Sequence, residues 1–355
     1  MSRFLSSRLK GLEPYVPGEQ PKIDNLIKLN TNESPFPPSE NAIRMSAEAA
    51  KNLQLYPDPE CSRLTETLAQ KLGVAKDEIL LTNGSDEILN FAFMAFCDSE
   101  RGAVFADITY GFYKVFAQLN GVPYREIALD ENLKINLDDY KGTDETIFIA
   151  NPNAPTGLYY EPEEIEKVIA SNPDRVVVVD EAYIDFGGRS CVPLIKKYDN
   201  LLVTQTFSKS RSMAGARLGF GVGCKGLIAD LNTIKYSTNP YNINSATMAA
   251  GIGSLTDEEY TVRNCNIICQ NREYTTQQLI RMGFDTTDSK TNFIFAKHKT
   301  IDGGTIYRKL RERGIVVRHF LKDRISDYNR ITVGTKEQMD SLLCALEDII
   351  KEETL

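Results

Sequence analysis

The segment from Val203 to Gly221 reads VTQTFSKSRSMAGARLGFG. It begins with apolar residues, as expected of a buried strand, and passes through hydroxyl residues to Lys209 and then, after small residues, to Arg217. A lysine at the end of a buried strand suits chemistry in which an amine condenses with an aldehyde, because burial readily lowers its pKa. A lone Ser-Lys pair is more often a surface lysine in a serine-rich loop, so the other segments must decide.

The composition is that of an ordinary globular protein, with 42% hydrophobic and 25% charged residues in a chain of 355. A formal charge of -8 disfavours nucleic acid or an anionic membrane as a partner. The N-terminal MSRFLSSRLKG lacks the apolar core of a signal peptide, and no apolar run approaches the ~20 residues of a membrane helix. We therefore expect a cytoplasmic protein. The seven scattered cysteines and two histidines favour neither disulfides, a metal site nor a Ser-His-Asp triad.

Residues 1–35 are predicted to form an extended N-terminal arm rather than a domain. Pro14, Pro17 and Pro21 interrupt it, and Pro35 and Pro37 close it. Such a segment buries little surface by itself, so we expect it to pack on the rest of the protein.

Residues 36–260 show short apolar strands alternating with helices. The expected strands are Ile79–Leu81, Ala103–Ala106, Tyr124–Ile127, Ile147–Ala150, Val176–Val179, Leu201–Val203 and Leu218–Val222. The expected helices are Ser39–Leu55, one capped by Ser62 and ended by Gly73, Ile88–Phe96, Phe112–Leu119 and Pro162–Ala170. This alternation predicts the α/β class, with a large domain built on a mostly parallel, seven-stranded type of sheet between helices.

Residues 261–355 are predicted to form a smaller α/β C-terminal domain that the arm joins. A long helix from Asp257 to Met282 would bridge the two domains. The expected elements that follow are strand Phe293–Ala296, helix Thr305–Arg313, strands Ile315–Val317 and Ile331–Val333, and an amphipathic last helix with Met339, Leu342, Leu343, Leu346 and Ile349 on one face.

Polar groups follow several of the expected strands. The Gly84-Ser85-Asp86 turn, the loop 151–157, Asp180 and Lys209 each come directly after an apolar strand. Ligands of open parallel sheets bind beyond the carboxyl ends of the strands, so we expect these groups to converge. An amine, a carboxylate and an anion cradle at a helix N-terminus are what pyridoxal phosphate needs.

The chemistry of each group suggests its role. Asp180 would keep the cofactor's ring nitrogen protonated, and Lys209 would hold the cofactor and act as general acid and base. Arg217, Ser208 and the amides of residues 84–86 would neutralise the phosphate, since a guanidinium offers a planar fork. Taken singly, each residue is more often a cap, a surface ion pair or a core hydrogen bond.

The chain resembles fold-type I pyridoxal-phosphate enzymes of the class I/II aminotransferases, and among them the histidinol-phosphate aminotransferases. The matching motifs run from end to end: PYVPGE (14–19), KLNTNESP (28–35), YPDP (56–59), TNGSDE (82–87), NPNAPTG (151–157), DEAYIDF (180–186), TFSKSRSMAGARLGF (206–220), TNFIF (291–295), GIVVR (314–318) and RITVGT (330–335). The segments with lysine, aspartate and arginine are specific for the superfamily, whereas PYVPGE, NTNE and RITVGT narrow it to this branch.

The resemblance implies roles for individual residues. Lys209 would bond to the cofactor aldehyde, Asp180 would pair with the ring nitrogen, Tyr183 would contact the ring hydroxyl and Tyr110 would stack on the ring. The phosphate would be gathered by Gly84, Ser85, Asp86, Thr206, Ser208 and Arg217, with Tyr56 reaching it from the neighbouring subunit of an obligate homodimer with shared sites. Substrate would be held by Arg330 on the α-carboxylate of glutamate, by Arg318 and Asn32 on a phosphate, and by Tyr15 near an imidazole.

One position departs from the family pattern. The family often has asparagine immediately before the PTG turn, where its amide donates to the ring hydroxyl, but this chain has Ala154. Asn153 is a candidate substitute, although a shift of one residue usually points the side chain elsewhere. Tyr183 alone would then carry the contact.

The expected reaction is transamination between L-histidinol phosphate and 2-oxoglutarate, which belongs to histidine biosynthesis. A threonine-phosphate decarboxylase and an aromatic aminotransferase of the same fold remain alternatives, because the same arginines serve several substrates. A module that has lost catalysis is disfavoured by the intact Lys209, Asp180 and Arg217.

Overall fold

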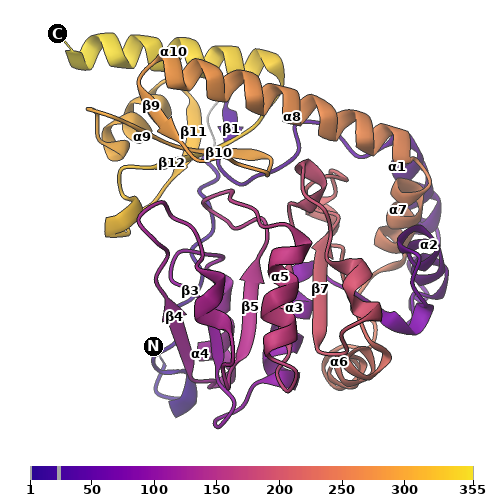
Figure 1. The fold of residues 1–355 in the computed structure, drawn as a ribbon. Coiled ribbons are helices and arrows are strands. Elements are labelled where there is room, and N and C mark those ends of the chain that lie inside the picture. The colour runs from indigo at the N-terminus through magenta and orange to yellow at the C-terminus, as the bar shows by residue number, and fades with distance from the viewer. Residues whose placement is uncertain (1, 22–24, 355) are drawn as a thin grey trace.

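The computed structural model describes residues 2–21 and 25–354, so positions 1 and 22–24 of the expected arm lie outside the described residues. The chain forms two sheets with helices packed on them (Figure 1). The first strands and helices are β1 (Ile27–Leu29), α1 (Glu40–Ala50), α2 (Ser62–Leu72), β2 (Ile79–Thr82), α3 (Ser85–Phe96), β3 (Ala103–Ala106), α4 (Phe112–Asn120), β4 (Tyr124–Ile127), β5 (Thr146–Ala150), α5 (Pro162–Ser171), β6 (Val177–Asp180), β7 (Leu201–Thr206) and β8 (Gly219–Gly223). They are followed by α6 (Lys225–Thr238), α7 (Ser245–Leu255), α8 (Glu258–Arg281), β9 (Phe284–Thr286), β10 (Phe293–His298), α9 (Gly303–Glu312), β11 (Ile315–His319), β12 (Asn329–Thr332) and α10 (Lys336–Thr354).

The larger sheet has seven strands in the order β2-β8-β7-β6-β5-β3-β4. Neighbours from β7 to β4 run parallel, whereas β8 is antiparallel to both β2 and β7. The predicted α/β class with a mostly parallel sheet is therefore confirmed. The carboxyl ends of β5, β6 and β7 lie side by side, which is the position where ligands of such sheets bind.

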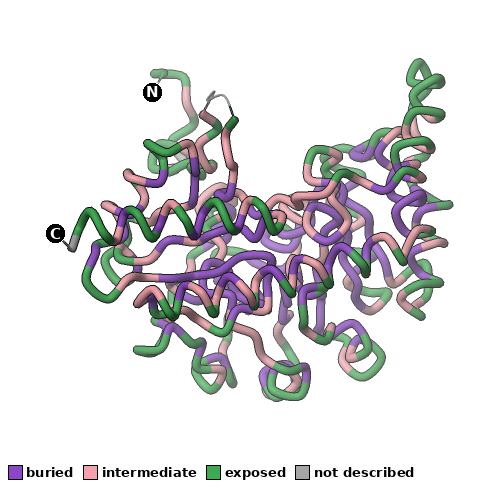
Figure 2. Tube along the Cα trace, turned by 90° about the horizontal axis from the view of Figure 1, so that it is seen from above, coloured by how far each residue is buried: buried purple, intermediate pink, exposed green. Residues whose placement is uncertain are grey.

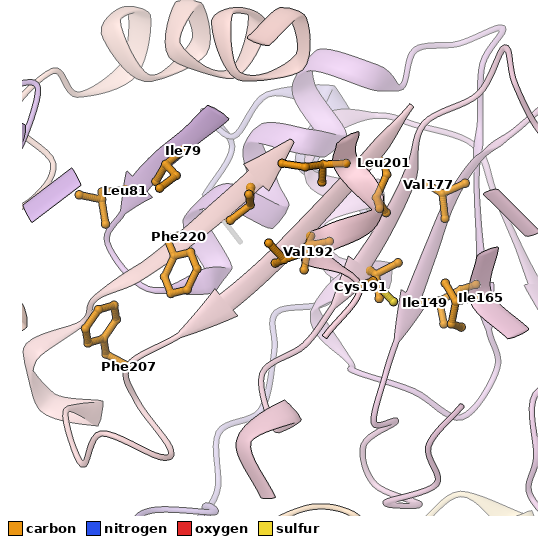
Figure 3. Packing of buried hydrophobic residues seen from close by; sticks show 14 of the residues in the cluster. Ile79, Leu81, Ile149, Ile165, Val177, Cys191, Val192, Leu201, Phe207 and Phe220 are labelled. Atoms are coloured by element: carbon orange, nitrogen blue, oxygen red, sulfur yellow. The ribbon is translucent and has the colours of Figure 1, made fainter. Parts of the chain in front are cut away.

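The central strands form because their side chains are buried on both faces. Successive residues alternate between the faces, so Val177 and Val179 of β6 join one hydrophobic cluster while Val178 joins another. Figure 3 shows part of the first cluster, in which Val177, Leu201 and Phe220 are labelled. A continuous apolar strand is thus stable only between two layers of helices.

The smaller sheet has the order β1-β11-β12-β10-β9. Its edge strand β1 comes from the N-terminal arm and pairs parallel with β11, with Leu29 opposite Val317. Leu29 is buried in the cluster that α10 also covers. The arm therefore lies on this sheet. Helix α10 has the expected amphipathic pattern, in which buried and exposed residues alternate along the helix (Figure 2).

Helix α8 runs along both parts of the protein. It begins beside α7 and extends to β9 of the smaller sheet and to α10 (Figure 1). Its long, mostly polar sequence was predicted as one bridging helix, and the observed bounds differ from the prediction by one residue at each end. The same helix thus contacts elements of both sheets.

Several local expectations were wrong. The first helix ends at Ala50 rather than Leu55, and α2 begins at Ser62, with Cys61 in the left-handed region at φ 51° as its N-cap. Asp58 replaces the expected serine cap, because its carboxylate accepts the backbone N–H of Ser62 at 2.7 Å. The sequence reading also omitted α6, α7 and β9.

Helix α7 was missed because it is rich in small residues and has no clear apolar stripe. Those residues let α1 approach closely, since a Cβ at Gly253 would come within 2.6 Å of the Cα of Ala42. Such a contact is decided by the packing of two helices and leaves little periodicity in the sequence of either.

Replacing Gly253 by alanine should destabilise the protein by about 1–3 kcal/mol, because α1 must shift to admit the methyl group. Urea unfolding measures the change. Gly226→Ala is the matched control, since its Cβ would meet only the sulfur of Cys224 at 3.8 Å and alanine favours a helix by up to about 1 kcal/mol. Equal stability of the two variants would contradict the packing explanation.

Candidate active site

A cavity of about 350 Å³ lies beyond the carboxyl ends of the central strands. The residues that line it come from the arm, from the start of α3, from the loop before α4, from the ends of β5, β6 and β7 and the segments that follow them, and from the β7–β8 connection. They include Thr31, Glu33, Ser85, Asp86, Tyr110, Ala154, Asp180, Tyr183, Thr206, Ser208, Lys209 and Arg217. The structure thus brings together most of the residues that the sequence singled out for the cofactor. Their roles stay predictions at this point.

One end of this cavity is an anion cradle at the N-terminus of α3. Arg217 donates from Nη2 to Oδ2 of Asp86 at 2.8 Å, and the hydroxyl of Tyr110 donates to Oδ1 of the same carboxylate at 2.5 Å. The hydroxyls of Thr206 and Ser208 lie 2.9 Å apart on the adjoining wall. A guanidinium, two hydroxyls and free helix amides form a site for a phosphate-sized anion.

Glycine is required at two positions around the cradle. Gly84, the N-cap of α3, has φ 77°, and a Cβ there would come within 2.6 Å of Nη2 of Arg217. A Cβ at Gly219 would lie 2.4 Å from the backbone nitrogen of Ser85. Glycine therefore lets β8 and Arg217 lie directly against the start of the helix.

Asp180, the last residue of β6, also lines this cavity. Its Oδ2 accepts from the hydroxyl of Tyr113 at 3.0 Å and its Oδ1 from the hydroxyl of Thr204 at 3.4 Å. Burial raises the pKa of this carboxyl to about 6, and the hydrogen bond from Tyr113 opposes that rise. A cationic group placed against Asp180 would find a carboxylate with few competing partners.

Lys209 lies three residues beyond β7 and lines the same cavity. Its Nζ donates to the backbone carbonyl of Thr31 at 3.3 Å and lies 5.9 Å from the ring centroid of Tyr183. Burial lowers the pKa of Lys209 to about 8, and the positive charge of Arg330 acts in the same direction. An amine in this state is available both as a nucleophile and as a proton acceptor near neutral pH.

A second, outer cavity of about 590 Å³ opens from the same lysine. Thr31, Tyr110, Ala154, Tyr183 and Lys209 line both cavities. The outer cavity also includes all four residues that the sequence assigned to the substrate, Tyr15, Asn32, Arg318 and Arg330. The amine of Lys209 thus stands where the two cavities meet.

Arg330, on β12, supplies a partly buried positive charge to the outer cavity. Its Nη2 donates to the carbonyl of Asn30 at 3.1 Å, and its Nε is buried without a hydrogen-bond partner in the part of the chain that the structure describes. Its guanidinium lies 5.3 Å from the ring centroid of Phe293. A partly buried guanidinium with an unsatisfied donor is suited to bind the anionic group of a ligand.

The arm forms a wall of the outer cavity. The ring of Tyr15 stacks on that of Phe112 of α4, with 4.2 Å between the ring centroids. The guanidinium of Arg318 donates to the backbone carbonyls of Val16 and Pro17 at 3.3 and 3.4 Å. Glu19 accepts from Tyr307 of α9 at 2.5 Å. The arm is therefore held from both sides, by the helix on the larger sheet and by the smaller sheet.

Asn32 connects the arm with Tyr183. Its Nδ2 donates to the tyrosine hydroxyl at 2.9 Å, and its own backbone, at φ 54°, is held by the hydroxyl of Thr332. The phenolic oxygen of Tyr183 is thus oriented toward a position that both cavities share.

Three of the predicted site residues, Gly84, Asn153 and Tyr56, do not line either cavity. Asn153 is buried and its amide donates to the carbonyl of Ile108 and the hydroxyl of Thr156, so its side chain is directed away from the site. Ala154 lines both cavities instead. Tyr56 is 82% exposed and stacks on Tyr241 at 4.7 Å, so within one chain it does not reach the site.

The sequence reading passed over Thr31, Glu33 and Tyr113. Thr31 and Glu33 belong to the polar cluster 29–33, of which only Asn32 was predicted to be a site residue. The polar residues next to Asn32 could have indicated that they also face the site. Tyr113 follows Tyr110 by one helical turn, but nothing in its sequence context indicated a contact with Asp180.

No cluster of three or more His, Cys, Asp or Glu side chains within residues 2–21 and 25–354 has an arrangement that could hold a metal ion. In that same part of the chain, none of the helices is both long and apolar enough to cross a membrane.

The comparisons with known proteins agree with this geometry. The profile of the family "Aminotransferase class I and II" matches residues 24–346. The histidinol-phosphate aminotransferase of Brachyspira hyodysenteriae is 47% identical over 99% of this chain and 100% of its own length. Among solved structures, the histidinol-phosphate aminotransferase of Clostridium acetobutylicum matches with a TM-score of 0.85 and 27% identity, over 92% of this chain and 100% of that one.

A second solved structure, of the Sinorhizobium meliloti histidinol-phosphate aminotransferase in complex with pyridoxal-5'-phosphate, matches with a TM-score of 0.90 over 99% of both chains. At 22% identity this likeness concerns the fold alone. The family profile and the full-length relative carry the assignment. The chain therefore belongs to the class I and II aminotransferases, and within them to the histidinol-phosphate aminotransferase family.

Proposed function

We propose that the protein is a pyridoxal-phosphate-dependent aminotransferase that converts L-histidinol phosphate and 2-oxoglutarate to imidazole acetol phosphate and glutamate, in histidine biosynthesis. The observation that carries the proposal is the meeting of two cavities at Lys209, one with an anion cradle and a buried carboxylate, the other with two arginines. Relatives that match over the full length bear the same activity in their names.

The inner cavity fits the cofactor. Arg217, Ser85, Thr206 and Ser208 would hold its phosphate, and Asp180 would face its ring nitrogen. When bound, pyridoxal phosphate supplies an aldehyde that takes up an amino group and a ring that withdraws electrons from the substrate Cα. Arg217 donates to the carboxylate of Asp86, which supports the proposal that its guanidinium can bind an anionic oxygen.

Lys209 would transfer the proton at the substrate Cα. A neutral amine can accept that proton and return it as an ammonium, and a pKa of about 8 allows both states near neutral pH. Tyr183 and Tyr110 line the wall on either side and would limit access of water to this atom. We propose a contact of Tyr183 with the ring hydroxyl, since Asn153 is directed elsewhere.

The two arginines would bind the anionic groups of the two substrates at different distances from Cα. In L-histidinol phosphate a phosphorylated hydroxymethyl group (CH2–O–PO3) replaces the carboxylate of an amino acid, so its phosphorus lies two bonds further from Cα than a carboxylate carbon does. Arg330 is partly buried and would bind the α-carboxylate of glutamate, whereas Arg318 and Asn32 would reach the phosphate. Tyr15 would cover the imidazole. Since the two substrates use the site in turn, both must fit it.

We also propose a homodimer with shared active sites. Tyr56 is 82% exposed, and Leu53 and Leu55 beside it are 57% and 64% exposed, which is unusual for adjacent apolar side chains in a monomer. A second copy that covers this segment would bring Tyr56 to the phosphate cradle of its partner. Because its substrates belong to central amino-acid metabolism, we propose the cytoplasm as its location.

The three segments outlined for the chain also remain a proposal: an arm of residues 1–35, a large cofactor-binding domain of residues 36–260 and a small domain of residues 261–355. The two separate sheets support this division into domains, and the inner cavity lies against the larger sheet.

The reaction can be followed by absorbance. Purified protein reconstituted with pyridoxal phosphate should show a band in the near-visible range that bleaches with L-histidinol phosphate and returns with 2-oxoglutarate. Bleaching only by aromatic amino acids would replace the proposed substrate, and release of carbon dioxide from threonine phosphate would indicate a decarboxylase. The absence of any band would refute the proposed chemistry at Lys209.

Arginine variants should separate the two substrates. Arg330→Ala should lower kcat/KM of the glutamate half-reaction by about a hundredfold, because a partly buried, charged hydrogen-bond donor is lost. Arg318→Ala should lower kcat/KM for histidinol phosphate more than for glutamate. Single-turnover measurements of each half-reaction test this, with Arg281→Ala on the far end of α8 as a control. An equal effect of Arg330→Ala on both substrates would show that the division of labour is wrong.

The charge of Lys209 should destabilise the apoprotein at neutral pH. Its pKa is lowered in the folded state, so the unfolded chain binds more protons between pH 8 and 10.5 and stability rises with pH across that window. Lys209→Met should therefore stabilise the apoprotein at pH 7 by on the order of 1–3 kcal/mol, less at pH 9.5. Urea unfolding measures this, and Lys51→Met on the surface should have little effect. A gain that does not depend on pH would contradict the argument.

A further inference from the structure

Among the described residues, the side chain of Tyr113 has one hydrogen-bond partner, which is Asp180. The tyrosine is the second residue of α4, it is fully buried, and its hydroxyl donates to Oδ2 of Asp180 at 3.0 Å. The centroid of its ring lies 5.7 Å from those of Phe105 and of Phe148. It lines neither cavity, so it approaches the carboxylate from the side of the aromatic core.

The hydroxyl of Tyr113 favours the ionised form of Asp180. Burial and the charge of Asp180 raise the pKa of Tyr113 well above its usual range, so the phenol remains a donor. A donor fixed at 3.0 Å stabilises a carboxylate, which only accepts, more than a protonated carboxyl group. The other side-chain donor, Thr204, is more distant at 3.4 Å.

The other groups around Asp180 differ in what they favour. Asp86 on α3 raises the pKa of Asp180 by charge repulsion, as burial does, whereas the backbone N–H of Ala182 lowers it. The phenols of Tyr110 and Tyr183 are also near and stay protonated, since burial raises the pKa of each. The carboxylate thus depends on a few neutral donors, of which Tyr113 has the strongest effect.

We propose that Tyr113 is a positioning residue that holds Asp180 ionised and directed into the inner cavity. This rests on the proposed function, in which Asp180 pairs with the protonated ring nitrogen of pyridoxal phosphate. The aromatic core beneath α4 then takes part in cofactor binding through a residue that does not touch the cofactor.

The test compares two ligands of the apoprotein. Pyridoxal phosphate needs an ionised Asp180, whereas the analogue with C–H in place of the ring nitrogen, deazapyridoxal phosphate, does not. Tyr113→Phe should weaken binding of pyridoxal phosphate about tenfold at pH 7, because one hydrogen bond to a charged group is lost. The loss should grow toward pH 6, since the pKa of Asp180 rises without its donor, and the analogue should bind as before.

Tyr140→Phe is the matched control. Tyr140 is also fully buried, and its hydroxyl has no hydrogen-bond partner among the described residues, so removal of its oxygen should leave both affinities unchanged. If Tyr113→Phe does not fold, 3-fluorotyrosine at position 113 keeps the ring and makes the phenol a stronger donor. The pH midpoint for binding of pyridoxal phosphate should then shift downward.

The outcomes separate the two proposals. If wild-type protein does not bind pyridoxal phosphate, the proposed function fails and this inference fails with it. If wild type and Tyr140→Phe bind it but Tyr113→Phe binds it equally well at every pH, only the role of Tyr113 is overturned. An equal loss for pyridoxal phosphate and its deaza analogue would likewise overturn it, because it would indicate a general packing defect.

Discussion

The constraint on which the site depends is that two partly buried cations, Lys209 and Arg330, line one cavity. Lys209 and Arg330 have carbonyl partners but form no ion pair with a carboxylate in the part of the chain that the structure describes. Beyond the effect of burial, the charge of Arg330 lowers the pKa of Lys209, and the charge of Arg318 lowers the pKa of Arg330, because like charges in a poorly solvated cavity repel. A ligand that brings anionic groups relieves this cost, so the folded chain is arranged in advance for such a ligand.

The fold supplies this arrangement by joining two sheets at one lysine. The larger sheet contributes Lys209, Asp180 and the phosphate cradle, whereas Arg330 and Arg318 lie on strands of the smaller sheet. The N-terminal arm completes the site, since Thr31 accepts from Lys209 and Tyr15 closes the outer cavity. Without the arm the smaller sheet would also lose its edge strand.

Much of this could be predicted from local sequence. Apolar strands such as VVVVD and LLVT can only be buried strands of a doubly covered sheet, so the α/β class and most element bounds followed from them. Lys209 and the turn at Gly84 could be predicted as parts of the site, because each follows an apolar strand and ligands bind beyond the ends of such strands. Helices α6 and α7 could not be predicted in this way, because they depend on neighbours distant in the chain. The cap by Asp58 could not be predicted either, because Asp58 competes with Ser62 as the acceptor.

The sequence by itself therefore determined the fold class, the family and the residues able to perform the chemistry, since periodicity, turn residues and motifs are local properties of the chain. Only the tertiary structure decided which of those residues face a cavity. It directed Asn153 away and left Tyr56 exposed, and it placed Tyr113 against Asp180. The physical reason is that a side chain's charge state and direction depend on desolvation and on partners from other elements, such as Asp180 and Tyr113, which are 67 positions apart.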